Sequence, residues 1–328
     1  MPTASSAKLE YEAGQDVKPI EALTDSGDAT TFTSSASLWS NRSGFAPVIT
    51  PDGLKTGGVI SPAAAAGNDD IDVTALTADV GGSEQSVSAQ ADVAITRAAT
   101  DVACINSITV TNAAAVVAVK GTDSADATFS ETRGAAGGPP LIATTSIEIG
   151  QVRVTSNVAA VITTSEIFQV VGVHQERADF PLFNTNISAG SVTFLSALPL
   201  IHTGSVPKGV SAQFSEPIFA EVSLASDFVP PETTHTVSST QIYNSTLGAV
   251  SSTLNAGSFT AFLQDGVTDG LVSLKNETLW FRFTPDRFKT ANIVANGVLG
   301  IARTFPADDN IAAACSVNAQ TDAVESAT

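Results

Sequence analysis

The residues SVSAQADVAIT (Ser86–Thr96) carry the clearest structural signal in this chain. Apolar side chains occupy every second position from Val87 to Ile95, and most of the positions between them are polar. A period of two is typical of a β-strand with one buried face and one face in water. The stretch therefore predicts a strand, and the sequence on both sides of it has the same character.

The next segments extend this pattern toward the C-terminus. INSITVTN (Ile105–Asn112) and AAVVAVKG (Ala114–Gly121) predict a β-hairpin. In the second half of the chain, Pro199 and Pro217 interrupt apolar runs, which indicates edge strands or bulged strands. Helical signals are weak, because only ALTADV (Ala75–Val80) and TTSEIFQVV (Thr163–Val171) favour a turn or two of helix.

The stretch SIEIGQVRVT (Ser146–Thr155) combines two strand phases in one segment. Its two isoleucines share one face, whereas its two valines follow the opposite phase after Gly150-Gln151. A slip of one residue at a glycine is typical of a β-bulge. We therefore predict a bulged strand here.

Composition agrees with a mainly β fold. Of 328 residues, 43 % are hydrophobic and only 15 % are charged, well below the roughly 25 % of ordinary globular chains. Ser, Thr, Ala, Gly and Val are abundant, and these residues suit pleated sheets and extended loops. We expect a β-sandwich or a barrel-like fold with an extended N-terminal arm, long loops and little helix.

Changes in polarity along the chain predict four regions. Residues 1–48 are polar with few hydrophobic side chains and predict an extended arm. Residues 49–170 and 171–305 read as two β-rich domains, joined near the charged stretch GVHQERADFP (Gly172–Pro181). Residues 306–328 form a polar, acidic C-terminal tail.

Charge limits the possible partners. The formal net charge is −18, from 15 Lys and Arg against 33 Asp and Glu. Tight binding to nucleic acid needs Lys and Arg that displace phosphate counterions, so neither nucleic acid nor an anionic membrane surface is an expected ligand. The first residues lack a basic and an apolar segment, and no apolar window of membrane-spanning length occurs, so neither a signal peptide nor a membrane span is expected.

Motifs for catalysis or cofactor binding are missing from the sequence. His174, His202 and His235 are far apart and have no metal-binding spacing, so we expect no metal site. Cys104 and Cys315 lie among small apolar residues, and we interpret them as buried free thiols. Neither a GxSxG elbow nor a Walker A loop occurs. We expect no catalytic residue and no cofactor, and we predict that the chain is not an enzyme.

Four charged residues are candidates for contacts between subunits or domains. Glu176, Arg177 and Asp179 crowd a stretch too charged for a plain strand. Arg282 lies in LWFRF, where its stem can pack on a sheet while its guanidinium reaches a carboxylate of a partner.

Several phrases, in their order along the chain, resemble the tail-tube (major tail) proteins of long-tailed, non-contractile bacteriophages. They span roughly residues 48–310 and contain no catalytic signature. The phrases are TPDGLKTGGVISPA (50–63), EIGQVRVTS (148–156), HQERADFPLF (174–183), TFLSALPLIHTGSVPKGV (193–210), PIFAEVSLASDFVPPETTHTVSSTQIY (217–243), LWFRFTPDR (279–287) and GVLGIARTFPADD (297–309).

This resemblance implies a structural virion protein that is assembled in the host cytoplasm. Its copies would form trimeric or hexameric rings that stack into a hollow tube, with further contacts to the tape measure, terminator and distal tail proteins. DNA would pass through the lumen during ejection without specific binding, and an acidic lumen would repel its phosphates. Residues 49–170 would be a second tube-like module or an outward decoration.

Three other classes remain open. The first is another virion part, such as a capsid decoration or baseplate protein, which would form closed oligomers. The second is a bacterial surface β protein, which would be detected on intact cells. The third is an enzyme without a known signature, which turnover abolished by one carboxylate substitution would establish.

Overall fold

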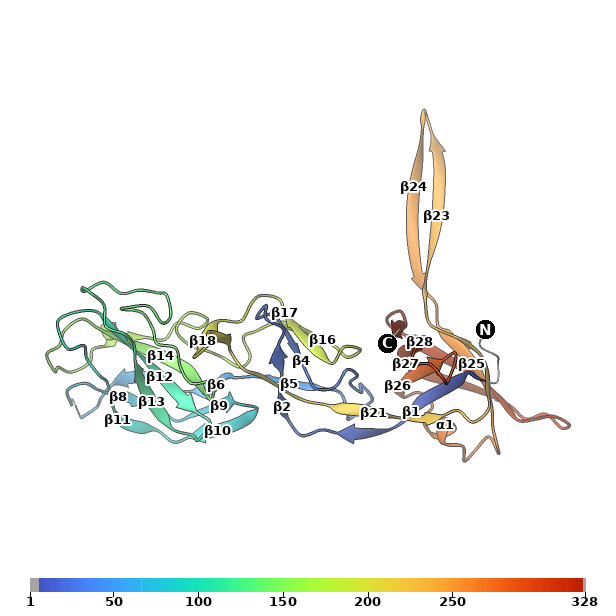
Figure 1. Cartoon of the computed structure of the whole chain (residues 1–328), viewed down its shortest axis with the longest axis horizontal. Coiled ribbons are helices and arrows are strands. Elements are labelled where there is room, and N and C mark those ends of the chain that lie inside the picture. Colours follow the sequence, from blue (N-terminus) through green and yellow to red (C-terminus); the bar gives the residue numbers. More distant parts are fainter. Residues whose placement is uncertain (1–5, 66, 327–328) are drawn as a thin grey trace. The chain divides into compact units, whose positions relative to one another are not determined.

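The computed structural model describes residues 6–65 and 67–326, which form two compact units. Unit 1 comprises residues 6–18, 38–47 and 214–326, and unit 2 comprises residues 19–37 and 48–213. Nearly all regular structure is antiparallel β-strand (Figure 1). The predicted mainly β fold with little helix is therefore confirmed.

The two units interleave along the sequence, whereas the sequence predicted β-rich domains in succession. The chain passes between them after residues 18, 37, 47 and 213. The physical reason is non-local strand pairing, because an early strand and late strands complete the same sheet.

Unit 1 is organised around one eight-stranded antiparallel sheet. Its strands in spatial order are β21 (Ser215–Glu221), β1 (Lys8–Val17), β26 (Thr278–Thr284), β27 (Asn292–Thr304), β28 (Ala312–Ala319), β25 (Gly257–Phe262) and β22 (Ala225–Val229), with β29 (Val324–Ser326) paired to β27. The path is open in the described residues, so β21 and β22 are its edges. Pro217 lies in an edge strand, as predicted, where its missing N–H does not interrupt a ladder between two neighbours.

Both ends of the described chain belong to this sheet. β1 pairs with β21 on one side and β26 on the other, although residues 1–48 were predicted to be an extended arm. β28 lies between β27 and β25, within the segment predicted to be an acidic tail. Its alternating Ala313, Cys315 and Val317 are buried in the core of unit 1. The alternating positions of this strand hold small side chains, and the acidic residues before and after the strand made the whole segment look like a polar tail.

Residues 38–47 contribute an aromatic contact to unit 1. Trp39 is fully buried and stacks on Phe214, with ring centroids 5.2 Å apart. The indole nitrogen of Trp280 donates a hydrogen bond of 2.7 Å to the backbone carbonyl of Trp39. Three segments far apart in the sequence are thus held in one unit.

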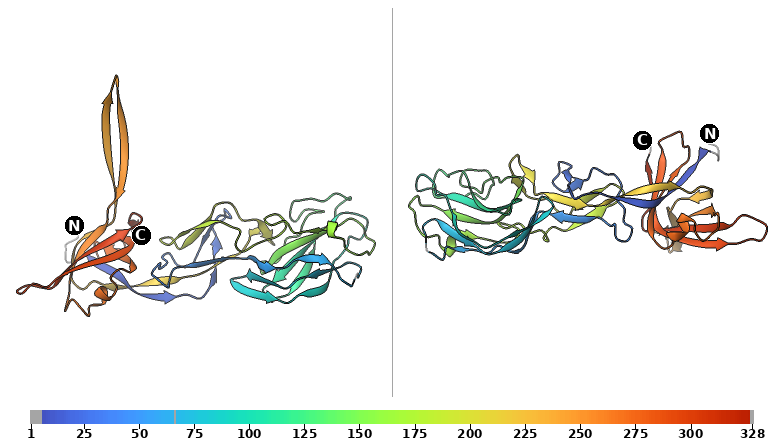
Figure 2. Two further views of the ribbon diagram at one scale, coloured as in Figure 1. Left: turned by 180° about the vertical axis from the view of Figure 1, so that it is seen from behind. Right: turned by 90° about the horizontal axis from the view of Figure 1, so that it is seen from below.

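A long hairpin also belongs to unit 1. It consists of β23 (Thr233–Ile242) and β24 (Ser245–Leu254), which pair over ten residues. The hairpin stands clear of the sheet in each view that displays its length (Figures 1 and 2). Helix in this unit is limited to the short α1 (Gly270–Ser273) among the described residues.

Three sheets of unit 2 enclose its main apolar core. They are β10-β9-β6, β11-β8-β7 and β13-β12-β14-β15, with bounds β6 (Gly53–Gly57), β7 (Ile60–Pro62), β8 (Asp70–Val73), β9 (Leu76–Val80), β10 (Ser83–Val87), β11 (Gln90–Ala94), β12 (Cys104–Thr111), β13 (Val116–Lys120), β14 (Ser146–Val154) and β15 (Ile167–Phe168). The predicted hairpin is confirmed, because Ile108 of β12 pairs with Ala118 of β13. Cys104 is a buried free thiol in β12, and Cys315 is one in unit 1.

Three further sheets complete unit 2. They are β2-β20-β5, β16-β17-β4-β3 and β18-β19, with bounds β2 (Glu21–Ala22), β3 (Thr24–Asp25), β4 (Thr31–Thr33), β5 (Val48–Pro51), β16 (Phe183–Asn186), β17 (Ser191–Phe194), β18 (Leu200–His202), β19 (Val206–Pro207) and β20 (Val210–Gln213). Pro199 lies directly before β18.

Two local expectations differ from the structure. The alternating stretch Ser86–Thr96 comprises the end of β10 and the whole of β11, which belong to different sheets, and Asp92 adopts a positive φ of 55°. Of the two weak helical segments, Ala75–Val80 contains strand β9, and Thr163–Val171 contains one 3₁₀ turn, η2 (Thr164–Glu166), followed by β15. Within the described residues, no helix has the length and hydrophobicity that a membrane crossing requires.

Glu12 of β1 is a fully buried carboxylate with three donors around it. It accepts hydrogen bonds from the backbone N–H of Trp280 at 3.0 Å, from Ser40 and from Gln15. A buried carboxylate is stable only when such partners satisfy it. Glu12 therefore ties β1 to β26 and to the segment that carries Trp39.

We predict that Glu12→Ala lowers the free energy of unfolding by about 2–3 kcal/mol, because it leaves buried donors without an acceptor. Glu12→Gln, which keeps one acceptor oxygen, should cost less. Urea unfolding followed by tryptophan fluorescence measures the difference. The control Glu216→Ala removes a more exposed carboxylate from edge strand β21 and should stay within about 0.5 kcal/mol of the wild type. An equal loss in both alanine variants contradicts the assignment.

Candidate functional site

A β-bulge in β14 separates an apolar from a polar face. Ile108 of β12 pairs with Gly150, and its neighbour Thr109 pairs with Glu148, so Ile149 is the extra residue. The predicted bulge is confirmed, one position before Gly150-Gln151. The slip keeps Ile149 and Val152 in the same buried core.

The polar residues of β14 form a dense network of hydrogen bonds and ion pairs. Glu148 pairs with the guanidinium of Arg133 and accepts a hydrogen bond from Ser107. Arg153 binds both carboxylate oxygens of Glu131, at 2.5 and 2.9 Å. The guanidinium of Arg153 also lies 4.5 Å from the ring centroid of Phe168. These charges are thus largely compensated within unit 2.

Residues 174–178 run between β14 and β6. The backbone N–H of Glu176 donates to the carbonyl of Glu148 at 3.0 Å, and the carbonyl of Glu176 accepts from Leu54 at 3.0 Å. Gly53 allows this close approach, because a Cβ at position 53 would lie 2.3 Å from the backbone nitrogen of Ala178. Backbone bonds on both sides therefore fix the direction of the Glu176 side chain.

The carboxyl group of Glu176 is buried and has no hydrogen-bond partner among the described residues. Although its backbone and stem are partly exposed, both carboxyl oxygens are hidden from solvent. Burial raises the pKa of Glu176 to about 8, while the nearby charge of Lys208 acts in the opposite direction. The side chain is thus mostly protonated at neutral pH.

Lys208 lies in the same region and is also buried. Its Nζ donates a hydrogen bond of 2.7 Å to the backbone carbonyl of Arg177. Among the described residues it forms no ion pair at contact distance, and burial lowers its pKa. Glu176 and Lys208 are therefore two buried ionisable groups that do not satisfy each other.

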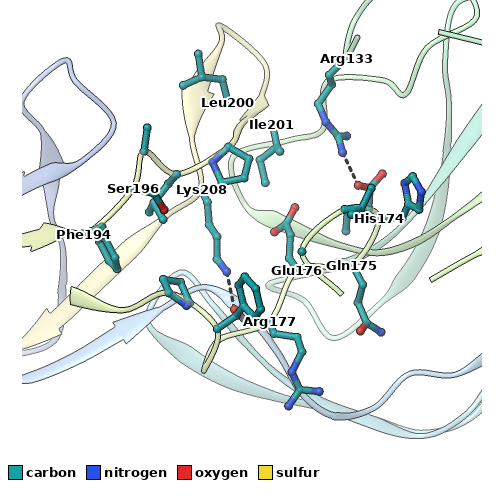
Figure 3. Close-up of a pocket in the computed structure, with 18 of the residues that line it drawn as sticks. Arg133, His174, Gln175, Glu176, Arg177, Phe194, Ser196, Leu200, Ile201 and Lys208 are labelled. Atoms are coloured by element: carbon teal, nitrogen blue, oxygen red, sulfur yellow. Dashed lines mark hydrogen bonds and ion pairs between the residues drawn. The ribbon is translucent and has the colours of Figure 1, made fainter. Parts of the chain in front are cut away.

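Both groups line a cavity of about 860 Å³ within unit 2 (Figure 3). β14 and residues 131–139 supply Glu148 and Arg133 to its wall, and residues 172–182, residues 194–201 and Lys208 supply the remainder. Its lining combines the buried Glu148, Lys208 and carboxyl group of Glu176 with apolar side chains whose surfaces are largely exposed, such as Leu182 and Leu195.

The residues predicted to make contacts between subunits fall into both units. Arg177 and Asp179 pair with each other on the surface of unit 2, with two N–O distances of 2.9 Å. Glu176, next to them in sequence, turns its carboxyl group into the cavity wall instead. That these three residues contact another subunit or domain stays a prediction.

Arg282 lies in β26 of unit 1. Its guanidinium binds Glu10 of the same chain at 2.7 Å and lies 4.2 Å from the ring centroid of Phe219. Arg282 thus packs against an aromatic ring of the sheet, in line with the prediction for its stem. The carboxylate that its guanidinium binds, however, belongs to the same chain and not to a partner. Sequence reasoning did not identify Glu10 because 272 residues separate the two.

The histidines do not gather at a site. Burial lowers the pKa of His174, whose Nδ1 lies 3.4 Å from Arg153. His202 is buried at the end of β18, with its Nδ1 3.0 Å from the carbonyl of Ala143. Within residues 6–65 and 67–326, no three His, Cys, Asp or Glu side chains group as metal ligands.

The β23–β24 hairpin is a second candidate, as a surface rather than a cavity. All of its strand residues are exposed except Thr233 and Leu254 at its base, which are partly exposed. Val237 and Val250 face each other across the two strands with 73 % and 70 % of their surfaces exposed. Such a surface without a partner inside its own chain is available for association.

Comparison with protein-family models found no match, and comparison with curated proteins found no significant relative.

We predict that Glu176→Gln changes how stability depends on pH. A carboxyl group whose pKa is raised in the folded state stabilises below its unfolded pKa of about 4.5, and this contribution is lost as pH rises through about 8. Glutamine does not titrate, so the variant should gain stability relative to the wild type over this interval. Thermal unfolding across the interval measures the gain. Parallel curves for the two proteins contradict the assignment, and the exposed Glu84→Gln is the control.

We also predict that Arg177→Glu impairs association between chains without unfolding unit 2. The Arg177 side chain pairs with Asp179, a highly exposed partner, so its loss should change stability by less than about 1 kcal/mol. Thermal unfolding and sedimentation velocity separate the two effects. Unchanged association would remove Arg177 from the contact surface.

Proposed function

We propose that this protein is a structural subunit that self-associates through its β23–β24 hairpin and builds the tail tube of a long-tailed bacteriophage. The exposed hairpin carries this proposal. The tail tube is the proposed assembly because several phrases of the sequence resemble tail-tube proteins.

The hairpin lacks the usual protection against strand association. Natural proteins protect edge strands with charges, prolines, bulges or short length. Both strands here are ten residues long, pair without a register shift, and contain no Asp, Glu, Lys, Arg or Pro. An isolated two-stranded ribbon has marginal stability in water. A partner that pairs with its edges would supply the missing contacts.

A second copy of this chain is the partner that these features favour. Val237 and Val250 lie on one face of the ribbon, whereas Ile242 and Leu247 lie on the opposite face by the alternation of the strands. All four are exposed. A ribbon with apolar side chains on both faces suits a place between two neighbouring subunits. The open edge strands β21 and β22 offer acceptor edges in each copy.

The difference between the units favours a hexameric over a trimeric ring. A trimer with six-fold pseudo-symmetry needs two equivalent tube modules in each chain. Unit 1 has one eight-stranded sheet, whereas unit 2 consists of sheets of two to four strands. Unit 1 is therefore the proposed tube module, and unit 2 is the added domain. In the virion, tape measure, terminator and distal tail proteins are the proposed further partners, and DNA is the cargo of the lumen.

We predict that the concentrated wild-type protein forms stacked rings or tubes with a central channel in negative-stain electron microscopy. The double variant Val237→Glu/Val250→Glu should remain unassembled, because each copy then presents two new charges on the ribbon. Its thermal unfolding should match the wild type, since both side chains are exposed. Val158→Glu is the matched control, because Val158 is 65 % exposed in unit 2.

The outcomes of this experiment distinguish a tail tube from the other classes of structural protein. Closed oligomers that never elongate would replace the tube with a decoration or baseplate role. A wild-type protein that stays monomeric at high concentration would contradict self-assembly. Normal tubes from the double variant would contradict the role of the hairpin while leaving tube formation in place.

A further inference from the structure

The cavity of unit 2 has the size and polarity of a small-molecule site. Its volume of about 860 Å³ falls within the range of about 300–1,000 Å³ that such sites occupy. Apolar side chains with 49–70 % of their surfaces exposed contribute to its lining, namely Val173, Phe180, Leu182, Leu195 and Leu200. Glu176 and Lys208 contribute polar groups to the same lining (Figure 3).

Most charged side chains that line the cavity already have an ion-pair partner. Arg133 pairs with Glu148, Glu131 pairs with Arg153, and Arg177 pairs with Asp179. Each pair contributes no net charge. Of the lysine, arginine, aspartate and glutamate side chains that line the cavity, Glu176 and Lys208 remain without an ion pair among the described residues.

Lys208 needs an acceptor and Glu176 needs a partner. The Lys208 ammonium has two N–H groups beyond the one that binds the Arg177 carbonyl. Both Glu176 carboxyl oxygens are buried without a partner among the described residues. Burial makes the Lys208 ammonium costly. The nearby Glu176, Asp52 and Asp179 favour its charge without forming an ion pair with it among the described residues. A carboxyl without a hydrogen bond is costly as well. One ligand group that contacts both would relieve both costs.

A carboxylate is the group that fits both. It accepts hydrogen bonds from the Lys208 ammonium and brings a negative charge into direct contact with it. It also accepts a hydrogen bond from Glu176, whose raised pKa keeps it protonated at neutral pH. A cationic head group would be repelled by the Lys208 ammonium, and an alcohol would bring no negative charge to it.

We propose that this cavity binds a small amphiphilic carboxylate, with its head group between Lys208 and Glu176 and its apolar body against Leu182, Leu195 and Leu200. Binding is non-covalent, and it is independent of the proposed self-assembly through the hairpin, which belongs to unit 1.

Titration calorimetry of the full chain with three probes tests the head group. Octanoate, octan-1-ol and octylammonium share one alkyl chain and differ in charge. Octanoate should bind at one site with at least about tenfold higher affinity than either of the others, which corresponds to about 1.4 kcal/mol. Its affinity should fall as pH rises through about 8, because ionised Glu176 then repels the carboxylate. Burial lowers the pKa of Lys208, so loss of its charge acts in the same direction. His174, Asp52 and Asp179 are further titratable groups around this pair.

Two variants test the location. Lys208→Met should weaken octanoate binding at least about tenfold, whereas Lys55→Met, at a more exposed lysine of unit 2 outside the cavity, should bind like the wild type. Because Lys208 is buried, Leu182→Asp provides a second variant at a position that is 70 % exposed, and it should also weaken binding while unit 2 stays folded by circular dichroism.

Three results would overturn the proposal. They are the absence of saturable binding with millimolar octanoate, equal affinity for all three probes, and wild-type affinity in a folded Lys208→Met or Leu182→Asp variant. Tube formation is unaffected by each of these results, so the failure of this site and the failure of the proposed function are distinguishable.

Discussion

The one-residue bulge at Ile149 determines which side chains of β14 enter the core of unit 2 and which lie on its polar face. Without it, the alternation of β14 would bring Val152 and Val154 to the face that carries Glu148. With it, both valines join Ile147 and Ile149 in the core, where each is at most 1 % exposed. The opposite face then carries carboxylate, amide and guanidinium groups at nearly adjacent positions. These groups need partners, and residues 131–133 and 174–178 supply them.

The bulge was predictable because its signal is local, whereas the cavity was not. Two isoleucines and two valines around one glycine are enough to predict a phase slip. The position of Lys208 beside Glu176 depends instead on where residues 194–208 pass, and no pattern in LPLIHTGSVPKG encodes that path. Sequence reasoning singled out Glu176 for its charge and placed it at an interface. The backbone bonds from Glu148 and Leu54 turn it inward.

The division into units was unpredictable for a related reason. Polarity along the chain marked residues 1–48 and 306–328 as separate from the folded parts, because both are rich in Ser, Thr, Asp and Ala. Yet Leu9 packs in the same core as Val317. Small side chains suffice in these strands, because sheet neighbours on both sides supply most of the burial. Strand pairing between distant segments, rather than local hydrophobicity, decides membership of unit 1.

The distribution of charge connects the acidic composition with association. Copies with a net charge of −18 repel each other, so a surface far from the carboxylates opposes association least. The screening length in physiological salt is about 8 Å. Ten strand residues extend about 33 Å at roughly 3.3 Å per residue, and the ribbon of β23 and β24 contains no charged Asp, Glu, Lys or Arg. Its distal half therefore meets a neighbour more than a screening length from its base. An acidic chain can thereby associate through an uncharged ribbon while its carboxylates keep other surfaces apart.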